Sequence, residues 1–505
     1  MNIKQAKEYI KNSVTLYLKK DEYGEYRMPV VRQRPIFLLG APGIGKTAIM
    51  EQIAQELGIA LVSYSMTHHT RQSALGLPFI TQKEYDGRTV SVSEYTMSEI
   101  IASIHETMEN SRIREGILFL DEINCVSETL SPAMLQFLQY KVFGRHSVPE
   151  GWVIVTAGNP PEYNKSVREF DVVTMDRLKI LEVEPDLRCW KEYAAERGIH
   201  SAVMNFLDLK KDSFYCMETT VKGRSYVTAR GWEDLSQILK LYEEEEYPVD
   251  EALIGQYLRN DRVVKEFAAY YDLYIKYKKD YQIADILAGQ ASARAYERAG
   301  LAAFDERLSL LGMLLDRVQA DMKDVMETTD YLTELLPMLK GIKALVSEAG
   351  AEDVQKRLET LIEARTKQME SLAAAGALSD TERKKIRRIL SFLEEGKKQI
   401  AGQDLRDGAE AFGCLKCQYD AGVAALRRKT DTTSGELHAL FSFVEDAGWK
   451  ENEMLILMTE LTVGVNSSRF IAAFGSEDYR KHNQELLLSE RQEELMTQID
   501  SLELT

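Results

Sequence analysis

A glycine-rich segment near the N-terminus has the residue types and the spacing of a phosphate-binding loop. Residues 40–47 read Gly-Ala-Pro-Gly-Ile-Gly-Lys-Thr and fit the pattern GxxxxGK[ST]. Glycines at these positions let successive backbone N–H groups turn toward one anion at the positive end of the following helix. The Lys46 ammonium would neutralise the charge of the β- and γ-phosphates, and the Thr47 hydroxyl would coordinate Mg²⁺. We predict that the nucleotide-contacting residues are Gly40, Ala41, Pro42, Gly43, Ile44, Gly45, Lys46, Thr47 and Ala48.

Two adjacent carboxylates follow a second apolar segment. Residues 117–120 (Ile-Leu-Phe-Leu) predict a buried strand that leads directly into Asp121 and Glu122. Ligands of open α/β sheets bind at the carboxyl ends of the strands, where these two side chains would lie. Asp121 suits the coordination of Mg²⁺, and Glu122 can polarise an attacking water. Such a pair can also mark a strand that reaches solvent, but the phosphate-binding loop earlier in the chain favours a function.

A polar side chain follows a third apolar segment. Residues 152–156 (Trp-Val-Ile-Val-Thr) predict a strand, and Asn159 comes shortly after it. If this strand lies beside the one that ends at Glu122, the Asn159 side chain is well placed to orient the same water. Asn-Pro sequences also supply ordinary turns, so Asn159 alone would favour a turn. Together with the other two motifs it favours a catalytic role.

The first 185 residues alternate between strand-like and helix-like segments, which predicts a parallel sheet covered by helices. Helical patterns occupy residues 46–57 and 131–140, and within residues 76–95 the pair Asp86-Gly87 predicts the turn of a β-hairpin. The strands expected in the sheet are residues 35–39, 60–64, 117–120, 151–156 and 179–183.

The rest of the chain has helical patterns only. Residues 186–247 read as several helices, and residues 248–505 as helices interrupted at Gly300, Gly350, Gly376 and Gly435. No proline follows Pro337, and proline costs a helix interior about 3 kcal/mol, so long helices are allowed there. We predict three segments: an α/β core with an N-terminal helix (1–185), an all-α lid (186–247) and an all-α C-terminal region (248–505).

Composition narrows the partners that we expect. The 63 Lys and Arg residues are outnumbered by 80 Asp and Glu, and the resulting net charge of −17 argues against a broad nucleic-acid or anionic-membrane surface. The five cysteines are odd in number and spread along the chain, and no apolar run could span a bilayer. The N-terminus has no secretory h-region. We expect a soluble cytoplasmic protein with no membrane partner.

The three motifs, in this order, resemble the AAA+ ATPases, and other features resemble the MoxR-like branch. The segment Gly76-Leu77-Pro78 with the following hairpin looks like the helix-2 insert of that branch, and so does Asp121-Glu-Ile-Asn124. Residues 469–475 (Arg-Phe-Ile-Ala-Ala-Phe-Gly) and 483–488 (Asn-Gln-Glu-Leu-Leu-Leu) look like its C-terminal region. Specific motifs cover roughly residues 30–245. The resemblance implies a P-loop AAA+ core that binds ATP and Mg²⁺.

The resemblance also implies a ring of identical subunits, a hexamer, with two further arginines at its nucleotide sites. Arg177, just before the last core strand, would be the arginine finger that reaches the neighbouring subunit, and Arg168 competes for that role. Arg230, in Thr228-Ala-Arg-Gly-Trp, resembles the second sensor at the start of a lid helix. A cation in the first turn of a helix is opposed by the helix dipole, which a nearby phosphate would explain.

MoxR-like ATPases are thought to remodel or mature other proteins, often with a partner that has a von Willebrand factor A domain, and the resemblance implies that role here. The nucleotide machinery is complete by Trp232, so we expect residues 248–505 to recognise a protein client or partner. One alternative is a nucleic-acid-translocating AAA+ motor such as a restriction subunit, against which the net charge argues. Another is a nucleotide-dependent scaffold without turnover, against which Glu122 and Asn159 argue.

Overall fold

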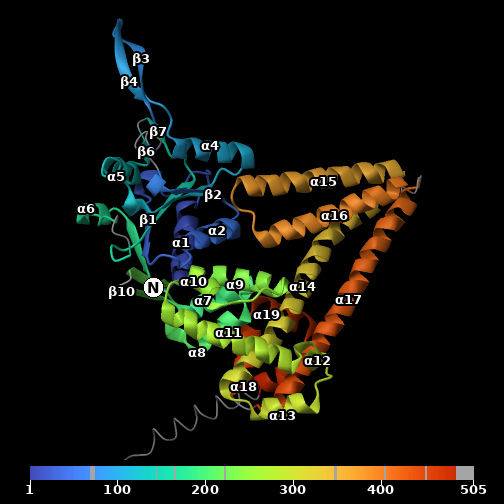
Figure 1. Cartoon of the computed structure of the whole chain (residues 1–505). Coiled ribbons are helices and arrows are strands. Elements are labelled where there is room, and N and C mark those ends of the chain that lie inside the picture. Colours follow the sequence, from blue (N-terminus) through green and yellow to red (C-terminus); the bar gives the residue numbers. More distant parts are fainter. Residues whose placement is uncertain are drawn as a thin grey trace, which may run out of the picture. The chain divides into compact units, whose positions relative to one another are not determined.

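The computed structural model describes residues 1–68, 74, 76–143, 145–163, 167–220, 223–345, 350–402, 405, 407–449 and 452–484. Contacts between residues divide the chain into two compact units (Figure 1). The first contains Met1–Cys189 together with Glu359–Leu390, and the second contains Trp190–Leu358 together with Ser391–Thr505. The division into three segments stays a prediction.

The first unit is built on a five-stranded parallel sheet with the strand order β2-β5-β8-β1-β9, which confirms the predicted fold class. All seven residues of β8 and the first five of β5 are buried, as expected for a parallel sheet with both faces covered. The strand register brings the carboxyl ends of β1, β5 and β8 to one edge of the sheet. The strands are β1 (Ile36–Gly40), β2 (Ala60–Ser65), β5 (Gly116–Asp121), β8 (Trp152–Gly158) and β9 (Lys179–Val183).

Helices cover both faces of this sheet because its apolar side chains alternate along each strand. On β1, Ile36 and Leu38 pack in one core cluster with residues of α1 (Ile3–Tyr17) and α2 (Lys46–Leu57). Phe37 points to the opposite face, where its cluster includes residues of α4 (Glu99–Ser111) and α5 (Ser131–Tyr140). A short helix, α6 (Val172–Met175), precedes β9.

The predicted hairpin is present as β3 (Pro78–Tyr85) and β4 (Arg88–Tyr95). Asp86 (φ 50°) and Gly87 (φ 74°) form the two-residue turn, and both have the positive φ that such a turn requires. A second, very short hairpin pairs β6 (Val142–Phe143) with β7 (His146–Ser147) and was not expected.

The second unit is predominantly helical, as predicted. Helix α7 (Leu187–Arg197) leads into it from the first unit. The helices that follow are α8 (Ser201–Leu209), α9 (Ala229–Glu244), α10 (Glu251–Tyr257), α11 (Asp261–Tyr281), α12 (Ile283–Leu287), α13 (Ala293–Leu301), α14 (Phe304–Leu345), α15 (Ala351–Ala374), α16 (Asp380–Gly402), α17 (Gly408–Asp446), α18 (Asn452–Val463) and α19 (Val465–Phe474). Of these, α15 and α16 each contribute residues to both units. None of the helices over the described residues combines the length and the apolar content needed to cross a lipid bilayer.

Two expectations for the helical segments need correction. The lid segment is not all-α, because β10 (Cys216–Thr220) and β11 (Gly223–Val227) form an antiparallel hairpin. Its strands carry the β-branched and aromatic residues that favour sheet, a signal that the helical interpretation of residues 186–247 passed over. Gly350 and Gly376 do lie between helices, but Gly300 and Gly435 lie inside α13 and α17. Glycine costs a helix interior only about 1 kcal/mol, so a long packed helix continues through it.

The turn between α15 and α16 covers the open edge of the sheet at β2. The Leu61 N–H on that edge donates a 2.8 Å hydrogen bond to the Ala375 carbonyl. Next to it, the Ser371 hydroxyl donates to the carbonyl of Ser111 at the end of α4 (2.6 Å). Gly376 ends α15 with a φ of +66°, and a Cβ there would lie 3.0 Å from the Leu61 carbonyl oxygen. Residues 359–390 belong to the first unit. Their contact with β2 protects an edge strand that could otherwise pair with another chain.

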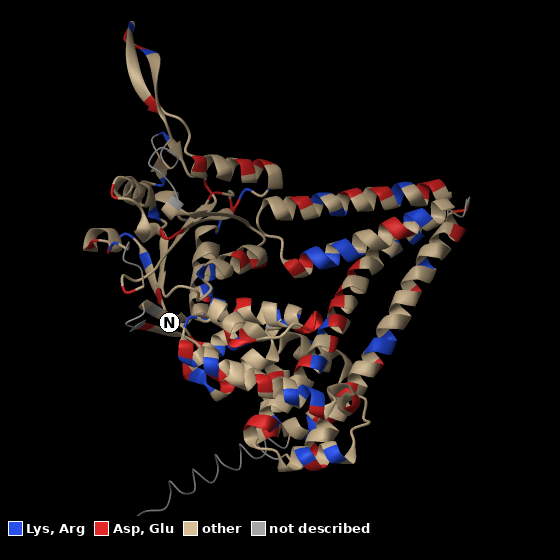
Figure 2. Ribbon diagram, viewed as in Figure 1, with Lys and Arg blue, Asp and Glu red and all other residues tan. Residues whose placement is uncertain are grey.

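Residues 381–388 (Thr-Glu-Arg-Lys-Lys-Ile-Arg-Arg) form a basic run at the start of α16, and two of its cations pair with carboxylates of the same helix. Lys385 pairs with Glu382 (2.8 Å) and Arg383 with Asp380 (3.5 Å). Figure 2 shows the blue turn of α16 bounded by red residues. The pattern is that of a solvated helix face with i,i+3 ion pairs.

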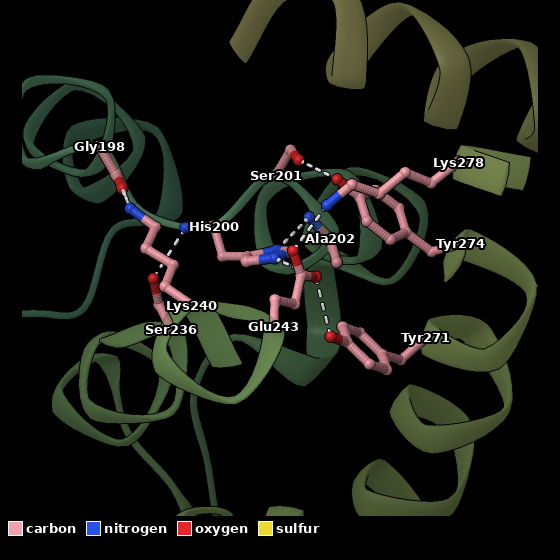
Figure 3. A network of polar contacts seen from close by, with 10 residues as sticks. All are labelled: Gly198, His200, Ser201, Ala202, Ser236, Lys240, Glu243, Tyr271, Tyr274 and Lys278. Atoms are coloured by element: carbon pink, nitrogen blue, oxygen red, sulfur yellow. Dashed lines mark hydrogen bonds and ion pairs between the residues drawn. The ribbon is translucent and has the colours of Figure 1, made fainter. Parts of the chain in front are cut away.

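In the second unit, the Glu243 carboxylate joins three helices (Figure 3). It forms hydrogen bonds with His200 before α8 (2.9 Å), with Tyr271 of α11 (2.9 Å) and with Lys278 of α11 (2.7 Å). Burial alone would raise the pKa of Glu243, but the hydrogen bonds and charges of His200 and Lys278 outweigh it and lower the pKa to about 2. The folded state therefore favours the ionised carboxylate.

We predict that Glu243→Gln lowers the free energy of unfolding at pH 7 by about 1–3 kcal/mol. A carboxyl whose pKa is lower in the folded state stabilises the protein above its unfolded pKa. That contribution is lost as the pH falls from about 4.5 toward 2. Denaturant unfolding at pH 7 and at pH 3 should show the difference from the wild type shrinking at the lower pH. Glu244→Gln, at the exposed neighbouring residue, is the control; an equal loss there, or a loss that does not depend on pH, would contradict the role of Glu243.

Candidate active site

The loop between β1 and α2 has the backbone of a phosphate cradle. Gly43 (φ 75°) and Gly45 (φ 92°) both adopt positive φ, which side chains with a Cβ rarely tolerate. Gly45 is the N-cap of α2, and the first helical hydrogen bond runs from the Ile49 N–H to the Gly45 carbonyl (3.1 Å). The N–H groups of a helical first turn lack acceptors within their own helix, and they point toward the loop. The segment predicted from the sequence is therefore built as an anion-binding turn.

Lys46 is buried at the edge of the sheet, with 8% of its surface exposed. Its Nζ donates hydrogen bonds to the carbonyls of Gly40 (2.8 Å) and Ala41 (2.9 Å) and to Oδ1 of Asn159 (2.9 Å). The three bonds match the three donors of an ammonium group, which makes its burial tolerable. Two residues predicted from separate motifs, Lys46 and Asn159, are thus in direct contact.

Thr47 and Asp121 also meet at this edge. The Thr47 hydroxyl donates to Oδ2 of Asp121 (3.2 Å), and the Glu122 N–H donates to Oδ1 of the same carboxylate (2.9 Å). A hydroxyl and a carboxylate on adjacent elements are the hard oxygen ligands that Mg²⁺ prefers, usually with several waters retained. The residues present therefore fit the ion that the sequence predicts.

Glu122 has an unusual backbone and two hydroxyl partners. Its φ of 55° lies in the left-handed region, which costs a residue with a Cβ about 1 kcal/mol or more and which occurs at functional sites as well as at turns and helix ends. Oε2 of Glu122 accepts hydrogen bonds from the hydroxyls of Ser65 (3.2 Å) and Thr67 (3.1 Å). Neither hydroxyl residue was predicted from the sequence. Their position at and just after the end of β2 is the signal that could have found them, because β2 ends at the same edge as β5.

The three arginines lie outside this cluster of contacts. Arg168 is exposed and pairs with Glu128 (2.6 Å), whereas the exposed Arg177 donates to the neutral amide oxygen of Gln139 (2.5 Å). Arg230 belongs to the second unit, where it is exposed in the first turn of α9, after the N-cap Thr228. The roles of all three stay predictions.

The C-terminal signature is described in part. Arg469 lies in α19 and pairs with both carboxylate oxygens of Asp330 (2.7 and 3.1 Å). Of residues 483–488, Asn483 and Gln484 are described, and 485–488 lie outside the described residues. The observed contacts of Arg469 hold α19 against α14.

Comparison with known families agrees with this geometry. Residues 36–175 match the model of the family described as ATPase family associated with various cellular activities (AAA). The matched span begins with β1 and ends with α6, so it contains the loop, Asp121, Glu122 and Asn159. No curated protein matches the chain. A domain of this family indicates nucleotide binding, typically with Mg²⁺, and ATP hydrolysis in general, and its members commonly assemble into rings. The match and the sheet together support an AAA+ ATPase.

Proposed function

We propose that this chain hydrolyses ATP at the carboxyl edge of its sheet, with the loop Gly40–Ala48 holding the phosphates. One observation carries the proposal: side chains from separate motifs converge there. Lys46 contacts Asn159 (2.9 Å), and Thr47 contacts Asp121 (3.2 Å). In the nucleotide complex, Thr47 and Asp121 would hold Mg²⁺, which would neutralise charge on the phosphates. Lys46 turns from one of its carbonyl acceptors toward the β- and γ-phosphates.

Glu122 is the proposed general base. It takes a proton from the water whose oxygen attacks the γ-phosphorus, and the bond from that phosphorus to ADP breaks. The hydroxyls of Ser65 and Thr67 hold the carboxylate by one oxygen, Oε2, which leaves Oε1 to face the water. Asn159 lies next to Lys46, and its amide orients the same water. This assignment gives every polar group of the cluster a role in the displacement.

We propose further that active sites are completed between subunits of a ring, a hexamer, with Arg177 as the arginine finger and Arg230 as the lid residue at the γ-phosphate. The contacts of the two candidate fingers favour Arg177 over Arg168. Arg177 would leave its hydrogen bond to the neutral Gln139 amide and its attraction to the nearby Asp171 carboxylate, whereas Arg168 would give up a 2.6 Å ion pair with Glu128. An exposed ion pair is worth up to about 1 kcal/mol, so the preference is modest.

The proposed role is that of a MoxR-like remodelling or maturation factor in the cytoplasm that acts on a partner protein, such as one with a von Willebrand factor A domain. The resemblance at Gly76–Pro78 and Asp121–Asn124 supports this role. So does the β3–β4 hairpin, where Tyr85 (52% exposed) and Val90 (47% exposed) lie on the same face and leave apolar surface in solvent. Apolar surface left in solvent is one mark of a protein-interaction site.

The base assignment is tested by Glu122→Gln. We expect kcat for phosphate release to fall at least about 100-fold, the usual scale for a general base, while the affinity for ATP is kept. The affinity for ATP should be kept because the loop and Lys46 hold the phosphates. The Glu122 carboxylate instead accepts its hydrogen bonds from Ser65 and Thr67. Phosphate release and fluorescent-nucleotide titration on the same sample measure both quantities. Near-wild-type turnover would refute the assignment.

The ring proposal is tested by mixing two inactive variants. Arg177→Ala should lower kcat by about 10³-fold, the scale of an arginine finger. Mixed with Glu122→Gln, it should regain activity, because some interfaces then combine an intact Glu122 with an intact Arg177. The same mixture made with Arg168→Ala separates the two candidate arginines. Mixed rings without recovery, or a specific activity that persists in a proven monomer, would contradict the proposal.

A further inference from the structure

We propose that Asn124 is a positioning residue that holds Asn159 in place for hydrolysis, an inference that rests on the proposed function. Asn124 belongs to the Asp121–Asn124 motif, but neither the phosphates nor the water needs its side chain. It lies on the short 3₁₀ turn Ile123–Cys125 that follows Glu122 and is only 5% exposed. A buried amide in such a turn needs a partner, and the partner it has is informative.

Asn124 joins the turn after β5 to the end of β8. Its Nδ2 donates a 2.8 Å hydrogen bond to the backbone carbonyl of Asn159. Its own backbone carbonyl accepts from the Arg168 N–H (2.9 Å). Asn124 therefore fixes the backbone positions of Asn159 and Arg168 relative to Glu122, which lies two residues before it in the chain.

The orientation of the Asn124 amide follows from this bond. Turned over, the amide would place Oδ1 against the Asn159 carbonyl, so that two acceptors would face each other. In the observed orientation, Oδ1 is buried without a hydrogen-bond partner in the described part of the chain. An unsatisfied buried acceptor costs about 1–3 kcal/mol. The observed orientation therefore keeps the hydrogen bond from Nδ2 to the Asn159 carbonyl, although it leaves Oδ1 without a donor among the described residues.

Gly158 makes the contact possible. A Cβ on Gly158 would lie 2.4 Å from Oδ1 of Asn124 and 2.7 Å from its Cγ, so any larger residue would push the amide away. Asn124 and Gly158 are therefore fitted to each other. At the end of β8, Gly158 is therefore required for steric reasons, and Asn159 supplies the polar side chain that contacts Lys46.

The contact is expected to govern turnover more than nucleotide affinity. Lys46 has two acceptors in the loop itself, Gly40 and Ala41, which do not depend on Asn159. Without the Asn124 donor, the backbone at Asn159 can shift, and its side chain loses its place relative to the water. A displacement of about 1 Å from a catalytic geometry can cost about 100-fold in rate.

The first test replaces the donor. Asn124→Asp keeps the shape and removes the N–H donor, and Asn124→Ala removes the whole amide. We expect kcat to fall about 10- to 100-fold in both variants, with the Kd for fluorescent ATP within about twofold of the wild type. Asn110→Asp, at an exposed asparagine of α4 in the same unit, controls for the added charge. A kcat near that of the wild type would overturn the proposal, and so would a parallel loss of nucleotide affinity, which would make Asn124 a folding residue.

The second test approaches the same contact from Gly158. Gly158→Ala should lower kcat about as much as Asn124→Ala, because the added Cβ displaces the amide. In the Asn124→Ala background the added Cβ meets no amide, so the double variant should match Asn124→Ala rather than lose activity twice over. Recovery of wild-type kcat in the double variant would overturn the proposal, since it would show that the Asn124 donor is not needed.

Failure of this inference is distinguishable from failure of the proposed function. Glu122→Gln, assayed beside these variants, reports on the function alone. If Glu122→Gln abolishes turnover while the Asn124 variants keep it, the function stands and the role of Asn124 is wrong. If Glu122→Gln keeps turnover, the proposed function is wrong, and the role of Asn124 falls with it.

Discussion

The buried ammonium group of Lys46 is the interaction on which the rest of the site depends. A charge taken out of water costs several kcal/mol unless hydrogen bonds replace its hydration. At Lys46 that replacement comes from the carbonyls of Gly40 and Ala41 and from the side chain of Asn159. The loop must therefore keep its tight turn, and β8 must end beside β1. Asn124 and Gly158 support this ending from the other side of Asn159.

Parallel pairing supplies the rest of the geometry. Because β5 and β8 run in the same direction as β1, their carboxyl ends bring Asp121 and Asn159 to the place where the loop begins. The adjacent β2 and the turn that follows it add Ser65 and Thr67 to the same edge, where their hydroxyls donate hydrogen bonds to Glu122. The open side of β2 is covered from far along the chain, by the turn that contains Ala375 and Gly376. A segment of the C-terminal helical region thus covers one edge of the sheet that positions the candidate site.

The strands of the sheet and the polar residues at its carboxyl edge could be predicted from the sequence. Each of these features is encoded by a short, continuous segment, so no knowledge of distant contacts was needed. The strands β1, β5 and β8 are mainly apolar runs, so the loop or polar residues that follow each of them could be placed at the same edge of the sheet, where Lys46, Thr47, Asp121 and Asn159 make contact. The contacts of Ser65 and Thr67 with Glu122 could not be predicted, because a hydroxyl residue at the end of a strand has no distinctive sequence pattern. The contact of Ala375 with Leu61 could not be predicted, because a break in the helical pattern indicates a turn but not the element on which that turn packs. The β10–β11 hairpin escaped because twelve residues between helices carry little periodic signal.

The most direct test of the account is phosphate release from ATP by the purified chain, with and without Mg²⁺, compared with Lys46→Met. Methionine keeps the buried volume of the side chain and removes only the ammonium group, so a loss of activity would report on charge rather than on packing. The account predicts phosphate release by the wild type that requires Mg²⁺, and loss of both nucleotide binding and phosphate release in Lys46→Met. Equal release by the two proteins, or a wild type that does not bind ATP, would contradict it.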